Sequence, residues 1–406
     1  MFRNNINSLI NASPGLSSEA RSGLLLCVQG SDVNYRDAFG WTSLSFACRC
    51  GNLAIVTELL QNKKVNVNVQ DNIGGTPLII AILVGNLRIV CALLQRREVI
   101  VNAQDKDGRT ALMIACVNGR LGIVCALLEH TDVDANLRDV DGQTPLIVAC
   151  AKKRLGMISE LLKHMEVEVD AQDKHGRTPL LAACSMGRKG IACMLLTRMD
   201  VNVNAQGRDG CTPLVGACVS GSWDIVWELL KREEVDVNAQ DKYGRTPLIM
   251  VCSMERWLSR SRCDLPFVCV LLNNSALEVN IRDKKGRSAL YVASVGDRWE
   301  IVLEMLKLDK LDVNARGAHG NTALIWACLR GRLEVVCALL DDNRVDVSVR
   351  NKAGSTALDL ARKCELFEIA HYLEEHAQVC LRRESEAKTE RQELNSSERK
   401  RRRLST

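Results

Sequence analysis

Eighteen cysteines are the residues of this 406-residue chain whose chemistry first needs an explanation. Thiols can form disulfides, bind zinc or act as nucleophiles, and each role needs fixed partners. Most fall into two series that repeat along the chain: Cys48, Cys116, Cys150, Cys184, Cys218, Cys252 and Cys328, and then Cys91, Cys125, Cys193, Cys269 and Cys337. The equivalent positions of other repeats hold Ile82, Ser294, Ser159, Trp227 and Leu303. Because isoleucine cannot replace a metal ligand, we predict small buried hydrophobic residues and no metal.

The six histidines show no catalytic pattern either. His371 and His376 are five residues apart, a spacing that does not bring them together on one helix face. The sequence contains no HExxH, GxSxG, GxxxxGKS/T or GxGxxG motif. We therefore predict no catalytic residues and no cofactor, and we expect that the protein is not an enzyme.

One phrase recurs along the chain. DKDGRTALMIACVNGRLGIVCALL begins at Asp105, and a close copy, DKHGRTPLLAACSMGRKGIACMLL, begins at Asp173. The repeats start at Asp37, Asp71, Asp105, Asp139, Asp173, Gly207, Asp241, Asp283, Gly317 and Asn351. The step between successive starts is constant, except for a longer interval between Asp241 and Asp283. A fixed period of this length predicts a solenoid in which each repeat packs on its neighbours.

Each repeat carries the signals of a turn followed by two short helices. A DxxG segment predicts the turn, and a threonine two residues later, such as Thr110, predicts the N-cap of the first helix. Proline follows this threonine in five repeats, at the first helical position. A glycine such as Gly119 predicts a left-handed end of that helix. Apolar pairs such as Ile123 and Val124 then predict a second helix.

These residues resemble those of the ankyrin repeat: Asp-x-x-Gly, Thr-Pro-Leu, Ala-Cys, Gly, Ile-Val, Leu-Leu and Val-Asn-Ala. The resemblance implies an all-α solenoid with short β-hairpin-like turns, an ankyrin repeat array. We assign residues 37–376 to the array, in ten repeats with an eight-residue insertion at residues 256–263. Residues 1–36 are predicted to form an N-terminal capping segment, a partial repeat, and residues 377–406 a charged flexible tail.

Two features depart from the family pattern. The family commonly has histidine after Thr-Pro-Leu, where it bonds neighbouring loops, but this chain has residues such as Ile79, Met113 and Tyr291 there. We therefore expect apolar packing to hold the loops together more than that polar bond does. The second departure is one extra residue after the second helix, as in EEVDVNAQ from Glu233 to Gln240. It makes each step one residue longer than is usual in the family.

The net charge of +5 is small and uneven. Residues 377–406 carry nine Lys/Arg and five Asp/Glu, which leaves a net charge of +1 for the rest of the chain. Such a body is not the generally basic surface of a nucleic-acid binder. The N-terminus shows no signal-peptide pattern, and no stretch is long and apolar enough for a membrane span. We therefore expect a cytoplasmic and/or nuclear protein without membrane contact.

The resemblance implies that partners bind the turn tips and the concave face of the first helices. Many tip residues are basic, and we predict a basic ridge from the third to the eighth repeat, interrupted in the fourth by Val140, Asp141 and Gln143. The ridge consists of Lys106, Arg109, Lys174, His175, Arg177, Arg208, Lys242, Arg245, Lys284, Lys285 and Arg287. The exposed ends of the first helices carry Leu83, Val84, Val117, Met186, Val219, Met254, Val295 and Leu329. An apolar groove beside a basic ridge suits an acidic amphipathic peptide. Solvated charges and inner packing are the alternative interpretation of the same residues.

Two further segments are candidate partner sites. The insertion, residues 256–263, contains Arg256 and Trp257, residue types common in binding hot spots, although it is equally consistent with a tolerated loop. The tail contains a basic run that resembles a nuclear import signal or a phosphate-binding patch, with a purely solubilising role as the alternative. The run consists of Arg399, Lys400, Arg401, Arg402 and Arg403. Ser405 is a candidate phosphorylation site, where phosphate would oppose this basic charge.

We therefore predict a non-enzymatic scaffold or adaptor that binds other proteins or peptides. The alternative is a regulator that binds nucleic acid or a phospholigand through the ridge and the tail. The near-neutral body and the lack of an aromatic stacking platform disfavour it. A regulatory fragment of a larger enzyme is a third hypothesis, disfavoured because the chain begins with methionine and shows no second domain.

Overall fold

The structure, a computed structural model, describes residues 2–11, 32–253, 264–317 and 319–379. These residues form helices joined by turns, and their β pairing is limited to two isolated bridges, Gln104 with Thr110 and Arg282 with Ser288. The chain divides into two compact parts, residues 1–233 and 234–406, which we call the N-terminal part and the C-terminal part. No helix within the described ranges is both long enough and apolar enough to span a lipid bilayer.

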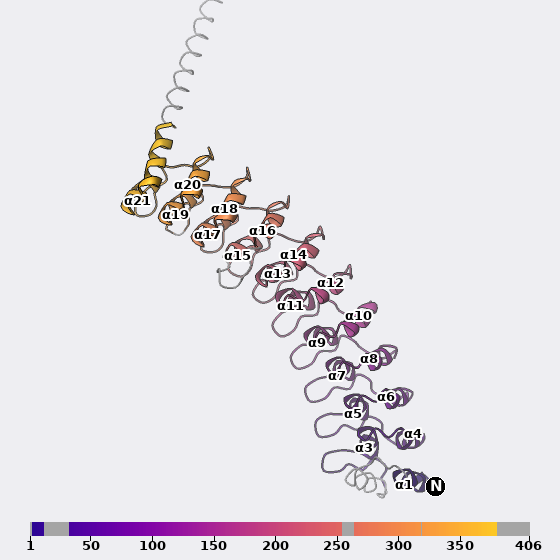
Figure 1. The fold of residues 1–406 in the computed structure, drawn as a ribbon. Coiled ribbons are helices and arrows are strands. Elements are labelled where there is room, and N and C mark those ends of the chain that lie inside the picture. The colour runs from indigo at the N-terminus through magenta and orange to yellow at the C-terminus, as the bar shows by residue number, and fades with distance from the viewer. Residues whose placement is uncertain (1, 12–31, 254–263, 318, 380–406) are drawn as a thin grey trace, which may run out of the picture. The chain divides into compact units, whose positions relative to one another are not determined.

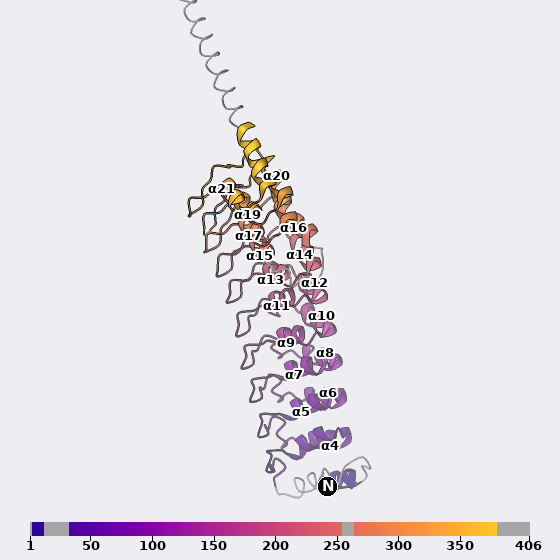
Figure 2. The same cartoon turned by 60° about the vertical axis from the view of Figure 1, so that its left-hand side comes forward.

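In the N-terminal part, short helices form pairs that stack in chain order. The first helices are α3 (Ser43–Arg49), α5 (Pro77–Val84), α7 (Ala111–Asn118), α9 (Pro145–Ala151), α11 (Pro179–Ser185) and α13 (Pro213–Val219). The second helices are α4 (Leu53–Gln61), α6 (Leu87–Leu94), α8 (Leu121–Leu128), α10 (Leu155–Lys163), α12 (Lys189–Leu195) and α14 (Trp223–Leu230). The two sets form two rows, and the loops project on the side of the first helices (Figure 1; Figure 2).

The C-terminal part repeats this arrangement. Its first helices are α15 (Pro247–Ser253), α17 (Ala289–Val295), α19 (Ala323–Leu329) and α21 (Ala357–Lys363). They pair with α16 (Asp264–Leu272), α18 (Trp299–Leu306), α20 (Leu333–Leu340) and a last helix, residues 367–379. This last helix runs three residues past the predicted end of the array at residue 376.

The first helices begin where the threonines predict. The hydroxyl oxygen of Thr110 accepts a hydrogen bond from the N–H of Met113 at 3.3 Å. The same bond forms at Thr42, Thr76, Thr144, Thr178, Thr212, Thr246, Thr322 and Thr356, and Ser288 makes it in place of threonine. Each cap satisfies a helix N–H that has no partner within the helix, which stabilises the fold by about 1 kcal/mol.

Left-handed backbone reverses the chain between the two helices of a repeat. Gly119 has φ 73°, and the other predicted positions, Gly51, Gly85, Gly187, Gly221 and Gly331, also have positive φ. The prediction of a left-handed helix end is therefore confirmed. Lys153, Asp297 and Glu365 take the same conformation with φ of 57° to 59°, although they have side chains that disfavour it. The positive φ at this turn is thus a feature of the repeat backbone that does not require glycine.

The core lies between the two rows of helices. In α5 every side chain from Pro77 to Ile82 is buried, whereas α6 buries only one face, including Ile89 and Leu93. Helix α5 contacts α7 and α6 contacts α8, so the apolar side chains of successive repeats form a shared core. Helix α1 (Phe2–Asn11), which the sequence analysis did not predict, packs against α4 with Ile10 fully buried. The predicted capping sequence that follows it lies largely in residues 12–31, outside the described residues.

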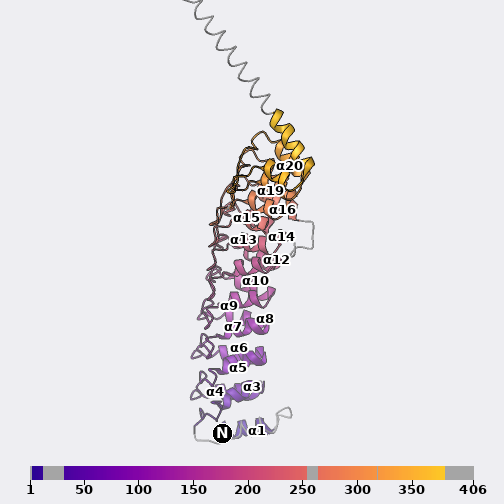
Figure 3. The same ribbon diagram turned by 90° about the vertical axis from the view of Figure 1, so that its left-hand side faces the viewer.

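Backbone hydrogen bonds join each loop to the next. The N–H of Lys106 donates to the carbonyl of Ile73, one repeat earlier, at 3.1 Å. Equivalent bonds join Asn72 to Phe39, Val140 to Asp107, Lys174 to Asp141, Lys284 to Tyr243 and Lys352 to His319. The loops of the N-terminal part consequently follow one another along one side of its stack (Figure 3). These backbone bonds hold the loops together in addition to the predicted apolar packing, which stays a prediction.

Candidate functional site

The loop aspartates shape the turn tips where partners were predicted to bind. Oδ1 of Asp173 accepts the N–H groups of His175 and Arg177 at 2.8 and 2.9 Å, and its Oδ2 accepts the Arg177 guanidinium at 2.8 and 3.0 Å. Burial alone would raise the pKa of Asp173, but these hydrogen bonds outweigh it and lower the pKa below its ordinary value. The same pairing joins Asp105 to Arg109, Asp241 to Arg245 and Asp283 to Arg287.

Four arginines of the predicted ridge are therefore engaged within their own loops, and binding of partners by them stays a prediction. The lysines differ from one another. Lys106, Lys284 and Lys285 are exposed and form no ion pair within the described residues. Lys174 pairs with Asp141 at 2.6 Å. The other two ridge cations, Arg208 and Lys242, are exposed, and the Lys242 amine lies 5.1 Å from the centre of the Tyr243 ring.

The loop charges do not form one continuous basic ridge. In the N-terminal part, residues 32–42, 65–76, 99–110, 133–144, 167–178 and 201–212 carry twelve Asp/Glu and seven Lys/Arg, a net charge of −5. In the C-terminal part, residues 235–246, 277–288, 311–322 and 345–356 carry six Asp/Glu and nine Lys/Arg, a net charge of +3. The loops that suit an acidic partner are therefore those of the C-terminal part, above all the loop with Lys284 and Lys285.

An apolar groove lies between the loops and the first helices of the N-terminal part. Leu83 and Val84 of α5, Met186 at the end of α11, and Val219 of α13 remain 43–52% exposed. One cavity of about 120 Å³ lies beneath Leu83, between the loops that contain Asp71 and Asp105 and the helices α5 and α7. A second, of about 50 Å³, is lined by Met186, Ile147, Asp173 and Arg177 among others. Leu83 and Met186 thus border hollows that a side chain of a partner can fill, whereas Val84 and Val219 line neither of the two.

An asparagine ladder ties most repeats to the next one and holds the loops in register. The side-chain N–H of Asn102 donates to the carbonyl of Asp132 at 2.7 Å, and its Oδ1 accepts the N–H of Asp134 at 3.0 Å. The same two bonds form at Asn34, Asn68, Asn136, Asn238, Asn280 and Asn314. Such a ladder makes the loop edge a rigid surface, which lowers the entropy lost when a partner binds.

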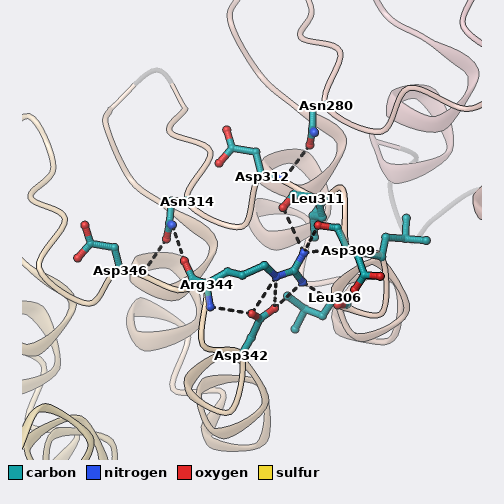
Figure 4. Close-up of polar contacts among 10 residues, drawn as sticks. Asn280, Leu306, Asp309, Leu311, Asp312, Asn314, Asp342, Arg344 and Asp346 are labelled. Carbon is teal, nitrogen blue, oxygen red and sulfur yellow. Dashed lines mark hydrogen bonds and ion pairs between the residues drawn. The ribbon is translucent and has the colours of Figure 1, made fainter. Parts of the chain in front are cut away.

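Arginines at the ends of second helices form another set of ties between repeats. Arg344 donates to the carbonyls of Leu306, Leu308 and Asp309 in the preceding repeat at 2.7–3.0 Å and pairs with Asp342 at 2.6 Å (Figure 4). A guanidinium suits this position because the last carbonyls of a helix have no partner within it. Arg96, Arg198 and Arg232 make corresponding bonds in the N-terminal part.

The first cysteine series packs in the core, as predicted. Cys48, Cys116, Cys150, Cys184, Cys218, Cys252 and Cys328 are all buried. Burial raises the pKa of the Cys218 thiol to about 12, so it is protonated and unreactive at neutral pH. The second series is only partly buried, and Cys91 is exposed, so the prediction of buried packing fails there. No cluster of His, Cys, Asp and Glu able to hold a metal ion occurs in the described ranges.

Several predicted site residues lie outside the described residues. These are Met254, Arg256, Trp257 and the rest of the insertion 256–263, together with the basic run 399–403 and Ser405. Among the described residues, the asparagine ladder and the arginine ties were not predicted from the sequence. A signal for the ladder was present, because asparagine or aspartate recurs three residues before each DxxG segment.

Comparisons with known proteins agree with this arrangement. Family models described as ankyrin repeats match residues 18–105, 67–139 and 131–206 (three copies), 209–242 (one repeat) and 305–361 (many copies). No curated protein matches the chain. The crystal structure of the ankyrin repeat domain of Bcl-3, a unique member of the IkappaB protein family, is similar at 29% sequence identity and a TM-score of 0.50. The match covers 57% of this chain and 99% of that domain. The chain therefore belongs to the ankyrin-repeat family.

Proposed function

We propose that this protein is a scaffold or adaptor that binds segments of other proteins along its loops and first helices. Ankyrin repeats generally mediate protein–protein interaction, and arrays of this family are typically not enzymes. The observation that carries the proposal is the apolar groove of the N-terminal part. Leu83, Val84, Met186 and Val219 remain about half exposed on helices that are otherwise the most buried of the fold. Apolar side chains beside hollows are typical of a binding surface.

The net charge of the loops supports an acidic segment as the partner of the C-terminal part. Lys284 and Lys285 project from a loop whose one aspartate, Asp283, is already neutralised by Arg287 at 2.7 Å. Rigid cations on a preorganised loop attract carboxylates and raise the association rate. Nucleic-acid or phospholigand binding is the second hypothesis from the sequence, and the net charge of −5 on the N-terminal loops argues against it there.

Selection of random displayed peptides against the full chain tests the proposal. We expect enriched peptides that combine acidic and leucine-like residues and that lose several-fold in affinity when Lys285 is changed to Glu. Lys363→Glu provides the matched control, because Lys363 is an exposed lysine of the same part that lies away from the loops. Peptides that bind both variants equally would contradict the acidic-segment proposal, and a selection without enrichment would contradict peptide binding itself.

The location of the protein is a separate proposal. The basic run 399–403 supports import into the nucleus, and a reporter fused to the last ten residues of the chain tests it. We expect nuclear accumulation that a Ser405→Asp change reduces, because the added negative charge opposes the run. A reporter that stays in the cytoplasm would contradict import by this segment.

A further inference from the structure

A second charged surface lies at the opposite end of the first helices from the loops. We call it the turn edge of the N-terminal part: residues 49–54, 83–88, 117–122, 151–156, 185–190 and 219–224, which join first to second helices. These segments include Leu83, Val84, Met186 and Val219, so the turn edge adjoins the apolar groove at the ends of the first helices. These segments carry eight Lys/Arg and one Asp/Glu, a net charge of +7. A first helix of seven or eight residues separates them from the loops by about 11 Å. The basic surface of this part is therefore the turn edge and not the loop edge.

The cations of the turn edge are hardly neutralised. Within the described residues, only Lys189 forms an ion pair there, with Asp224 at 3.2 Å. Arg154 and Arg188 donate to the carbonyls of Val117 and Cys150, at 3.3 and 2.7 Å, so they keep their full positive charge. Residues 151–156 are exposed throughout, including Lys152 and Lys153. Such uncompensated charge is costly to fold stability through mutual repulsion, which points to a role in binding.

A row of leucines runs between these cations. Leu87, Leu121 and Leu155, each the first residue of a second helix, are 41%, 43% and 49% exposed. Each of the first two lies over a glycine of the following repeat: a Cβ added to Gly122 would meet Leu87 at 3.3 Å, and one added to Gly156 would meet Leu121 at 3.4 Å. The glycines leave the surface flat, although glycine within a helix costs about 1 kcal/mol relative to alanine.

The C-terminal part shows that the fold itself does not require this surface. Its described turns, residues 295–300, 329–334 and 363–368, carry four Lys/Arg and five Asp/Glu, a net charge of −1. Glu300, Glu334 and Glu368 stand where three repeats of the N-terminal part have glycine. The position of the leucines stays apolar: Trp299 is 8% exposed, Leu333 is half-buried and Phe367 is 77% exposed. Because the backbone is equivalent but the charge is opposite, the basic charge of the turn edge is specific to the N-terminal part.

We propose that the turn edge of the N-terminal part binds an acidic amphipathic α-helix of a partner protein. Stacked helices lie about 10 Å apart, so Leu87, Leu121 and Leu155 follow one another at roughly that interval. One heptad of an α-helix rises by about 10 Å, so a helix that runs along the edge presents one residue per heptad to each repeat. Apolar residues at that heptad position meet the leucines, and acidic residues on either side meet the lysines and arginines.

Synthetic helices test this proposal on the full-length protein. The probe is a fluorescein-labelled peptide of three heptads with leucine at the first position, glutamate at the two flanking positions, and alanine or glutamine elsewhere. A control peptide of identical composition places its leucines six and eight residues apart, which breaks the match to the repeat. Fluorescence anisotropy measures the Kd of each peptide, and circular dichroism verifies that every protein variant is folded.

Matched variants locate the binding surface. Leu87, Leu121 and Leu155 are changed together to Gln, with Ile73, Ile100 and Val140 changed to Gln as the loop control, because these three are 67%, 57% and 72% exposed. Lys152→Glu is compared with Lys106→Glu, since both lysines are exposed and lack an ion pair in the described ranges.

We expect the heptad peptide to bind and the out-of-register peptide to bind at least about tenfold more weakly. The leucine variant should also lose about tenfold and Lys152→Glu several-fold, while both loop controls stay within about twofold. The proposal is overturned by failure of the heptad peptide to bind, by equal binding of the two peptides, or by equal loss in the loop controls. It is also overturned if anionic phospholipid vesicles or duplex RNA bind more tightly than the peptide through Leu121 and Lys152. Loss in the loop controls alone would place the peptide at the loops, so binding at the turn edge and binding at the loops are distinguishable.

Discussion

Replacing Asp170 with Asn should stabilise the protein, because Asp170 is the defective member of the asparagine ladder. Its Oδ2 accepts the N–H of Asn202 at 2.9 Å, but its buried Oδ1 has no hydrogen-bond partner in the described residues. The other rungs donate an amide N–H to a carbonyl 30 residues later, and that register puts the carbonyl of Asp200 opposite Oδ1. Two acceptors, Oδ1 of Asp170 and the carbonyl oxygen of Asp200, therefore face each other, whereas Asn102 and Asn136 each place an N–H donor opposite a carbonyl.

The expected gain is about 1 kcal/mol, the net value of one recovered hydrogen bond. Removing the charge of the buried carboxylate adds to this gain in stability. Burial, together with the charge of Asp200, disfavours the charged form and raises the pKa of Asp170 above its ordinary value of 3.8. A raised pKa means that the folded protein binds a proton more tightly than the unfolded chain does. Wild-type stability at this position therefore rises as the pH falls through the folded pKa, and the advantage of Asp170→Asn should shrink over the same range.

Urea unfolding at pH 7 and at pH 4 measures both effects, with hydrogen exchange at the amide of Asn202 as a local probe because a repeat array need not unfold in one step. The matched control is Asn136→Asp, which should create the same defect one repeat earlier and destabilise the protein by a similar amount. A neutral or destabilising Asp170→Asn alongside a destabilising Asn136→Asp would refute the reasoning. So would an advantage of Asp170→Asn that is as large at pH 4 as at pH 7.

Three further predictions concern the ties and the core. Arg344→Ala should cost about 2 kcal/mol, measured by hydrogen exchange in α18, because carbonyls of the preceding repeat lose a charged donor; unchanged exchange would contradict it. Gly317→Ala should cost about 2 kcal/mol in urea unfolding, because the new Cβ would overlap the Tyr291 ring. Adding Tyr291→Leu should recover most of this loss, and failure to do so would exclude the clash as its cause. Cys218, whose pKa burial raises to about 12, should resist iodoacetamide at pH 8 while exposed Cys91 is alkylated, as read by mass spectrometry; labelling of both would show that the core opens.

Local signals predicted the helices well because each depends on a few neighbouring residues. Thr110 caps a helix wherever its hydroxyl can reach the N–H three residues on, and Gly119 ends that helix by its free access to positive φ. The positive φ of three non-glycine residues, Lys153, Asp297 and Glu365, was not predictable in this way. The packing of each repeat on its neighbours imposes this conformation, and the residue type does not.

The charges of the candidate site were predicted less well because pairing depends on side-chain geometry. From the sequence, Arg177 and Lys285 are equivalent cations at turn tips. In the structure Arg177 is bound to Asp173 at 2.8 Å, whereas Lys285 has no ion pair within the described residues. An arginine four residues after the loop aspartate reaches back to it across the turn, whereas Lys285, two residues after Asp283, forms no ion pair within the described residues. Counting cations therefore overestimates the positive surface.

In a repeat protein, equivalent positions of different repeats can be compared, which separates residues that the fold requires from residues that are available for binding. The loop aspartate recurs in both parts because its carboxylate holds the turn, as at Asp105 and Asp283, so its charge reveals nothing about partners. The second residue of each second helix is different, since it changes from Gly156 in one part to Glu334 in the other without altering the backbone. This position holds glycine in three successive repeats of one part, Gly122, Gly156 and Gly190, and glutamate in three of the other, Glu300, Glu334 and Glu368. Its residue type therefore reflects the surface of each part and not a requirement of the backbone. By this criterion the turn edge of the N-terminal part is a stronger candidate interface than the predicted ridge of loop cations.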